Sequence, residues 1–191
     1  MATVEALKDK RDIELIKTVF KHKNIRYYLL FVVGCNTGLR IGDILKLKVS
    51  DLITGERRAI KKHLVVNEQK TGKLRQIAIN NSIQKAFKLY LAQYNPSAED
   101  YLFESRKGVH MPISCTQAYR ILNAAASDCK IDINFGTHTM RKTWGYWTYK
   151  TTGNNLGLVM EMLNHSSPSI TLRYIGITQE QKDDTYMSVE I

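Results

Sequence analysis

The chain has 191 residues, a formal net charge of +10 and a sequence pI near 9.5. This length fits one domain with a sizeable hydrophobic core, and 43% apolar with 24% charged residues argues against a collagen-like or intrinsically disordered chain. The positive excess has two readings, a surface that binds a polyanion or simply a basic solvated surface, and charge alone does not choose between them.

The cysteines and the apolar runs bound the cellular setting. Cys35, Cys115 and Cys129 are far apart and form no CxxC pair. We therefore expect neither a disulfide framework nor a zinc cage, and a reducing, intracellular environment. The N-terminus becomes charged before any apolar run develops, which argues against a signal peptide. The apolar run Tyr27–Leu39 is too short to span a bilayer, so we expect a soluble protein.

The beginning of the chain is helical in pattern. Apolar residues at helical spacing predict a helix over Asp9–His22. Asn24 is placed to cap a second helix that ends near residue 36. Thr37-Gly38 breaks that helix, and Ile41–Leu47 resumes the helical spacing.

A short β-hairpin is predicted next. His63–Asn67 and Leu74–Ile79 are β-branched and partly alternating, and Thr71-Gly72 supplies the turn between them. Helical patterning then returns over several segments: Ser82–Tyr94 capped by Ser82, Ser114–Cys129, Thr137 to about Lys150, Leu156–Leu163, one starting at Ser167-Pro168, and a last one from about Gln179. The predicted fold class is mainly α with a small antiparallel β-sheet, an α+β domain.

Two basic residues stand at breaks in this pattern. Arg40 follows the helix break, with Asp43 three residues further on, and Lys70 lies beside the hairpin turn. Taken singly, each has an ordinary explanation. Arg40 and Asp43 fit a surface ion pair across one helical turn, and Lys70 fits a solvated turn residue.

A second group of polar residues follows in the C-terminal third. His138 and Arg141 are spaced i, i+3 and so project from one face of a helix. His165 stands between two short helices, and Tyr174 lies on the second of them. Each is again explained singly, by capping, by snorkelling at the edge of an apolar stripe, or by a half-buried tyrosine.

Taken together, these residues make a different case. They read Arg, Lys, His-x-x-Arg, His and Tyr, on a helix break, a hairpin, a helix, a loop and a short helix. This order and spacing resemble the catalytic domain of the tyrosine recombinases, the phage integrase family. Four stretches that span nearly the whole chain carry the resemblance: Thr37–Leu52 (TGLRIGDILKLKVSDL), Glu68–Ile79 (EQKTGKLRQIAI), Thr137–Gly145 (THTMRKTWG) and Leu163–Ile177 (LNHSSPSITLRYIGI).

The resemblance implies an enzyme that cuts and rejoins DNA strands through a covalent 3′-phosphotyrosyl intermediate, with no metal and no other cofactor. It makes Tyr174 the nucleophile. It implies these further site residues: Arg40 and Arg141 clamping the scissile phosphate, Lys70, His138 and His165 completing the pocket, and Asp43 in support. The fold that it implies is that of the tyrosine recombinase catalytic domain.

The chemistry of these side chains is consistent with those roles. Planar guanidinium groups match phosphate charge bidentately, in place of the metal ion of other phosphoryl-transfer enzymes. A phenol with a pKa of about 10 is a weak nucleophile at neutral pH. Neighbouring cations should favour the phenolate, and His138 can accept its proton. Lys70 can protonate the leaving 5′ oxygen, and His165 can donate to a non-bridging oxygen.

The sequence also departs from the family pattern. Asn164 stands where the family often has Gly before the second His. The first catalytic Arg is already residue 40, so we expect residues 1–191 to form a single catalytic domain without the family's N-terminal DNA-binding domain. A natural short form and an excised fragment both fit. Gln179–Ile191 could dock on a neighbouring protomer or pack on its own core.

The resemblance implies double-stranded DNA as partner and four protomers on that DNA, while a free monomer stays open. We expect no membrane partner and a cytoplasmic protein, bacterial or phage-encoded. Two other functions remain open. One is a DNA-binding module of the same fold without strand exchange, since the charge is basic. The other is a nuclease or topoisomerase that uses the same chemistry without recombination.

Overall fold

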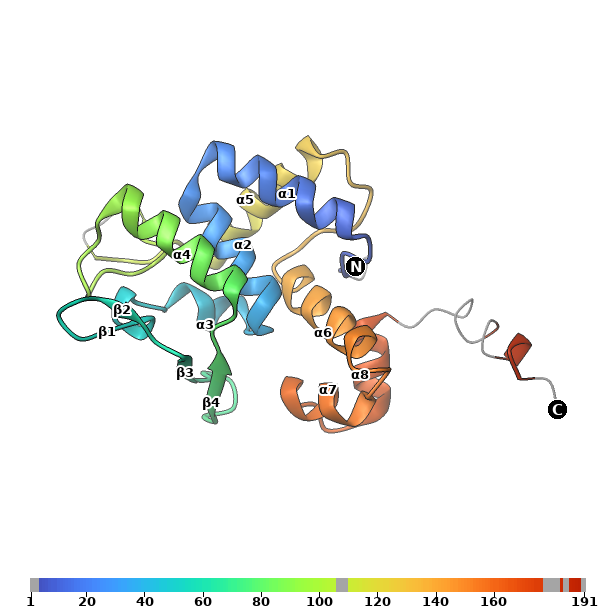
Figure 1. Ribbon diagram of the computed structural model, residues 1–191. Helices are drawn as coiled ribbons and strands as arrows, with labels where there is room; N and C mark the ends of the chain where they lie inside the picture. The colour runs from blue at the N-terminus through green and yellow to red at the C-terminus, as the bar shows by residue number, and fades with distance from the viewer. Residues whose placement is uncertain (1–3, 106–109, 177–182, 184–185, 190–191) are drawn as a thin grey trace.

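The computed structural model describes residues 4–105, 110–176, 183 and 186–189 (Figure 1). The helices in chain order are α1 (Lys10–Lys23), α2 (Ile25–Thr37), α3 (Ile41–Leu45), α4 (Asn81–Tyr94), α5 (Cys115–Asp128), α6 (Thr139–Thr151), α7 (Leu156–Leu163) and α8 (Pro168–Ile175), with a 3₁₀ turn at Val49–Asp51. The strands are β1 (Ile53–Thr54), β2 (Ala59–Ile60), β3 (His63–Asn67) and β4 (Leu74–Ala78).

Helix α2 forms the centre of the molecule. Its residues Leu29–Val33 are at most 1% exposed, and it packs against α1, α4 and α6 (Figure 1). Asn24 has an extended backbone, ends α1, and accepts hydrogen bonds from the backbone N–H groups of Arg26 and Tyr27 at the start of α2. The predicted boundary at Asn24, and the two helices around it, are therefore confirmed.

The strands form two separate antiparallel pairs. The predicted hairpin is present as β3 and β4, with Val65 opposite Gln76 at its centre. Strands β1 and β2 pair over two residues each, Ile53 with Ile60 and Thr54 with Ala59. This second hairpin was not predicted, because two-residue strands are too short to show an alternating pattern. The fold class, mainly α with small antiparallel sheets, is confirmed.

Two helix starts differ from the sequence prediction by one or two residues. Helix α4 is capped by Asn80, whose Oδ1 accepts the backbone N–H of Ile83, so Ser82 lies inside the first turn. Helix α6 has His138 rather than Thr137 at its N-cap. The buried hydroxyl of Thr139 accepts the N–H of Gly136 and so closes the turn just before the helix. The shift leaves His138 at the N-cap of α6, just before its first turn.

Helices α7 and α8 close the fold against α6. Val159, Leu163 and Ile175 are fully buried there, with Trp144 and Tyr174 packed around them. Figure 1 shows this pair of helices beside the β3–β4 hairpin. The packing holds the short helix α8, which carries Tyr174, against the helix that carries His138 and Arg141.

All three cysteines are free. Across the described residues, no helix is both long and apolar enough to cross a membrane.

Most of Gln179–Ile191 lies outside the described residues, so its docking role stays a prediction. Tyr186, Met187 and Val189 are described and are 61–79% exposed, so these three side chains do not pack on the core.

Candidate active site

The break between α2 and α3 presents Arg40. Gly38 ends α2 in the left-handed conformation, with φ of 62°. A Cβ on Gly38 would lie 2.4 Å from the Trp144 ring, so this backbone runs directly against α6. Arg40 occupies the N-cap of α3 with an extended backbone. The predicted helix break therefore places Arg40 beside α6.

Arg141 lies at the floor of the site. It is 2% exposed, and its guanidinium donates to the carbonyl oxygens of Gly38 and, at 2.7 Å, of Leu163. The first carbonyl lies two residues before Arg40, and the second lies two residues before His165. One buried guanidinium thus joins the α2–α3 break to the corner between α7 and α8. Burial lowers the pKa of Arg141 from its usual value.

A carboxylate that we did not predict sits among the arginines. Glu68 is 0% exposed, and its Oε2 accepts from Arg40 Nη1 at 2.8 Å. Its Oε1 accepts from Arg75 Nη1 at 2.9 Å and lies 4.0 Å from Arg141 Nη1. One signal in the sequence could have found it. Leu64 and Val66 are the buried positions of β3, so strand alternation places Glu68 on the inward face as well.

The hairpin turn carries Lys70, and Asp43 supports it. Asp43 is 4% exposed, and its Oδ1 accepts the backbone N–H of Gln69 at 3.1 Å. Lys70 is the next residue, and its side chain is exposed at the tip of the hairpin. Asp43 therefore fixes the backbone from which Lys70 projects, rather than forming the ion pair with Arg40 that its spacing suggested.

Tyr174 lies between the two predicted histidines. Its hydroxyl is 3.5 Å from His138 Nδ1, and its ring meets that of His165 edge to face, with centroids 4.9 Å apart. His165 Nδ1 is 3.1 Å from the hydroxyl of Thr171, which lies one turn before Tyr174 on α8. The structure thus brings together the three side chains that the sequence places on three different elements.

The electrostatics of these groups are set mainly by burial. Burial raises the pKa of Tyr174 above 10.0, although the charges of Arg141 and Arg40 act in the opposite direction. We expected the neighbouring cations to favour the phenolate. In the free protein their effect is smaller than that of burial, which favours the neutral hydroxyl. Burial and the cations Arg141, Lys142, Arg40 and Lys70 lower the pKa of His138 below 6.5. His165 has a lowered pKa for the same kinds of cause.

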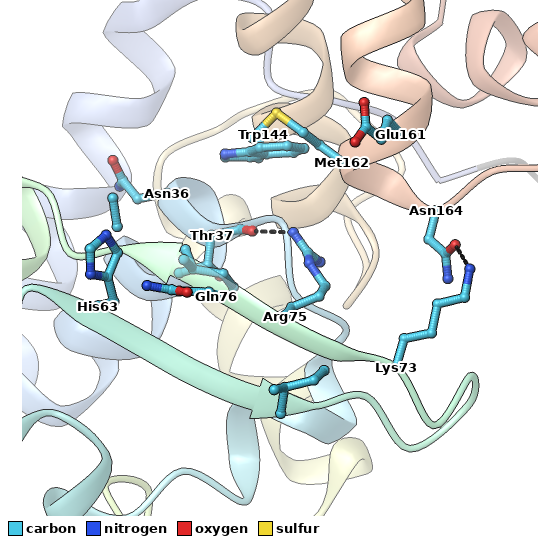
Figure 2. A pocket seen from close by; sticks show the side chains of 13 residues that line it. Asn36, Thr37, His63, Lys73, Arg75, Gln76, Trp144, Glu161, Met162 and Asn164 are labelled. Carbon is cyan, nitrogen blue, oxygen red and sulfur yellow. Dashed lines mark hydrogen bonds between the residues drawn. The ribbon is translucent and has the colours of Figure 1, made fainter.

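A cleft of about 760 Å³ opens beside the arginines, between β4 and helices α6 and α7 (Figure 2). Arg75 projects into it and donates to the carbonyl of Thr37 at 3.4 Å. At its rim, Lys73 Nζ donates to Asn164 Oδ1 at 2.8 Å, which joins the hairpin to the corner before His165. Asn164 has φ of 55°, the left-handed conformation that Gly or Asn adopts most readily, and it caps α7.

All seven predicted site residues therefore lie on elements that meet around Arg141. Arg40 and Arg141 are joined through Glu68, Tyr174 contacts both histidines, and Asp43 holds the turn of Lys70. Within the described residues, no group of three or more His, Cys, Asp or Glu side chains is arranged to hold a metal ion. The arrangement offers an oxygen nucleophile, a neutral imidazole and several guanidinium groups in one place.

The chain is similar to known proteins over almost its full length. The model of the phage integrase family matches residues 7–181. A probable integrase/recombinase, YoeC of Bacillus subtilis, is 40% identical over 186 residues, which are 97% of each chain. The chain spans about half the length of other curated relatives that are named tyrosine recombinases, for example 54% of one from Pseudothermotoga lettingae at 27% identity.

Solved structures share the same fold. The crystal structure of XerA recombinase aligns with a TM-score of 0.75 at 19% identity, over 98% of this chain and 66% of that one. XerH site-specific recombinase bound to its difH substrate aligns with a TM-score of 0.69 at 18% identity, over 97% of this chain and 55% of that one. These likenesses confirm the fold that the four sequence stretches implied.

Proposed function

This chain belongs to the phage integrase family, and we propose that it cleaves and rejoins double-stranded DNA through a covalent bond between Tyr174 and a 3′ phosphate. The relatives named tyrosine recombinases support this class of reaction. The observation that carries the proposal is the cluster around Tyr174. Its hydroxyl lies 3.5 Å from a histidine nitrogen on the helix whose Arg141 is buried at the floor of the site.

The arginines would hold the scissile phosphate. A phosphodiester carries one negative charge, and more charge gathers on its non-bridging oxygens as the fifth bond to phosphorus forms. Forked guanidinium groups match these oxygens in geometry and charge. Arg40 and Arg141 stand on either side of Glu68, whose single negative charge leaves their side of the site positive overall. They would stabilise the transition state electrostatically.

Tyr174 would act as the nucleophile and His138 as its base. Since burial keeps the pKa of Tyr174 high, the hydroxyl needs a proton acceptor at the moment of attack. The lowered pKa of His138 keeps its imidazole neutral near pH 7 and able to accept. As the Tyr174 oxygen bonds to phosphorus, its proton passes to His138 and the bond from phosphorus to the 5′ oxygen breaks.

The leaving 5′ oxygen must receive a proton. Lys70 is exposed at the hairpin tip and can swing to that oxygen as general acid. His165, held by Thr171, can donate to a non-bridging oxygen. The phosphotyrosyl bond conserves the energy of the broken phosphodiester, so attack by another 5′ hydroxyl rejoins the strand without a high-energy cofactor.

The wider setting follows from the same proposal. The solved XerH structure holds a recombinase on its DNA substrate, and we extend double-stranded DNA as ligand to this chain. Recombination would then use four copies of a catalytic domain that covers residues 1–191, with the C-terminal segment as a docking element. A bacterial or phage-encoded protein that acts on chromosomal DNA would work in the cytoplasm.

A covalent-capture experiment tests the nucleophile. A nicked duplex that loses its 5′ hydroxyl fragment after cleavage should trap a protein–DNA adduct that survives denaturing electrophoresis. Tyr174→Phe should abolish the adduct, because the ring remains but the attacking oxygen is gone. Tyr119→Phe is the matched control, since Tyr119 is 47% exposed on α5. Persistence of the adduct in Tyr174→Phe would disprove the assignment.

A further inference from the structure

The buried carboxylate of Glu68 contacts three arginines and the hairpin turn. It accepts from Arg40 at 2.8 Å, from Arg75 at 2.9 Å and from the hydroxyl of Thr71 at 3.0 Å. Its Oε1 also lies 4.0 Å from Arg141 Nη1. Two of these partners belong to the phosphate clamp proposed above, and Thr71 belongs to the hairpin turn next to Lys70.

A carboxylate with no exposed surface is costly unless it is paired and hydrogen-bonded. Here the partners more than compensate. Burial alone would raise the pKa of Glu68, but the hydrogen bonds from Arg75, Arg40 and Thr71 bring it down to about 2. Glu68 is therefore an anion at every pH at which the enzyme would act.

This anion has a geometric consequence for the arginines. Three guanidinium groups so close together repel one another, and three positive charges with one negative charge leave a net +2. Glu68 reduces the repulsion and fixes one edge of Arg40. A guanidinium has five N–H donors, so Arg40 keeps donors free for phosphate oxygens.

The carboxylate also reaches the general-acid segment. Glu68 directly follows β3, two residues before Lys70, and the same Oε2 that binds Arg40 accepts from Thr71 on the other side of Lys70. The backbone N–H of Gly72 donates to the Glu68 carbonyl at 2.8 Å. The turn that carries Lys70 is thus closed around the residue that holds Arg40.

We propose that Glu68 is a positioning residue of the strand-cleavage reaction, which orients Arg40 toward the scissile phosphate and sets the hairpin turn of Lys70 relative to it. The inference rests on the proposed function. It differs from a purely structural ion pair because it predicts a loss of cleavage rate in protein that is folded and still binds DNA.

The test compares Glu68→Gln with wild type in single-turnover adduct formation on the nicked duplex, at saturating DNA. The amide keeps the shape of the side chain and removes its charge. We expect the rate to fall at least about tenfold, the size expected for losing a charge-assisted hydrogen bond. Duplex affinity should change less than about threefold, since many phosphates contribute to it. Glu99→Gln, which removes an exposed ion pair with Lys48, should change neither.

A double-variant cycle separates positioning from general destabilisation. Arg40→Lys keeps the charge of Arg40 but loses the fork that Glu68 orients. If Glu68 acts through that fork, adding Glu68→Gln to Arg40→Lys should slow cleavage by no more than about threefold further. Multiplicative losses would overturn the role of Glu68 in orienting Arg40, and an unchanged rate in folded Glu68→Gln would overturn the whole inference.

Two further outcomes are also decisive. If Glu68→Gln fails to fold, Thr71→Val removes one hydrogen bond to the same Oε2 from an exposed turn. It should slow cleavage by about threefold or more with an unchanged melting temperature, and an unchanged rate would contradict the inference. If wild type itself forms no adduct, the proposed function has failed, whereas an adduct formed equally by wild type and Glu68→Gln rejects only the role of Glu68.

Discussion

The hydrogen bonds of the buried Arg141 side chain go to backbone carbonyls of the protein itself. It donates to the carbonyls of Gly38 and Leu163, and each of these carbonyls lies two residues before another site residue, Arg40 or His165. A charge with 2% exposure needs such partners to be tolerated. The same two bonds fix the distance between the α2–α3 break and the α7–α8 corner. One residue therefore serves both the fold and the geometry of the proposed phosphate site.

His138 gives a prediction for the pH dependence of cleavage. Its pKa is lowered, first by burial and then by Arg141 and Lys142. A base with a lowered pKa stays neutral further into the acid range. The second-order rate of adduct formation at low DNA concentration, which reports the free enzyme, should therefore hold until pH falls below about 6.5. Measured from pH 5 to 8, an acid limb centred above that value would contradict the assignment.

The variant His138→Gln is the control for that profile, because glutamine does not titrate. It should lower the plateau rate and move or remove the acid limb.

The lowered pKa of His138 also has a consequence for stability. Because the pKa of His138 is lowered in the folded protein, the unfolded chain binds a proton at this histidine more readily. The free energy of unfolding should therefore decrease as pH falls below about 6.5.

The sequence could identify the site residues only as a set, and it missed Glu68. Arg40, Lys70 and Tyr174 were found because their types and order match a family, not because any one of them is unusual. Glu68 lies inside one of the matching stretches and has no role in that pattern. Its importance comes from burial between Arg40 and Arg75, a tertiary property. Strand alternation was the one local signal that it points inward.

At the scale of elements, the break after α2 should be the most sensitive point. Gly38 has φ of 62°, and a Cβ there would lie 2.4 Å from Trp144. Gly38→Ala should lower the free energy of unfolding by at least about 2 kcal/mol, from backbone strain together with displacement of the ring. Urea denaturation measures this loss. Adduct formation should fall as well, because the Gly38 carbonyl holds Arg141.

Gly55 provides the matched comparison. Its φ is 66°, almost the same, but nothing lies within 4 Å of the position of its Cβ. Gly55→Ala should therefore cost only the backbone strain, about 1 kcal/mol, and leave adduct formation unchanged. Equal destabilisation by the two variants would show that the contact with Trp144 does not matter.

The elements were predictable to the extent that their local signals were strong. Asn24 caps α2 as expected, and α7 has the predicted bounds. The helices expected to start at Ser114 and at Ser167-Pro168 are α5 and α8, and the two serines are their N-caps. The β1–β2 pair was missed because its strands have two residues each, and pairing over that length depends on the surrounding structure. The helix contacts that converge on Arg141 are long-range, so no local pattern could place them.

At the scale of the whole molecule, distant parts of the chain build one basic site. Arg40 at the N-cap of α3, Arg75 on β4 and Arg141 on α6 meet at one carboxylate. The net charge of +10 was ambiguous at the level of composition. The structure places three of the positive charges around Glu68. A cluster of guanidinium groups with a cleft beside it, and Lys73 at the rim, is suited to a phosphate chain rather than to general solvation.

This arrangement predicts how the chain should bind duplex DNA. Because phosphate contacts release counterions, affinity should fall steeply with salt. Engagement of only four phosphates would weaken binding roughly a hundredfold between 50 and 200 mM salt. We expect this electrostatic contribution to dominate the affinity, because the basic groups of the site face a phosphate backbone. Fluorescence anisotropy with a labelled duplex, titrated at several salt concentrations, measures the slope. An affinity that hardly changes with salt would mean that base contacts, not phosphates, hold the duplex.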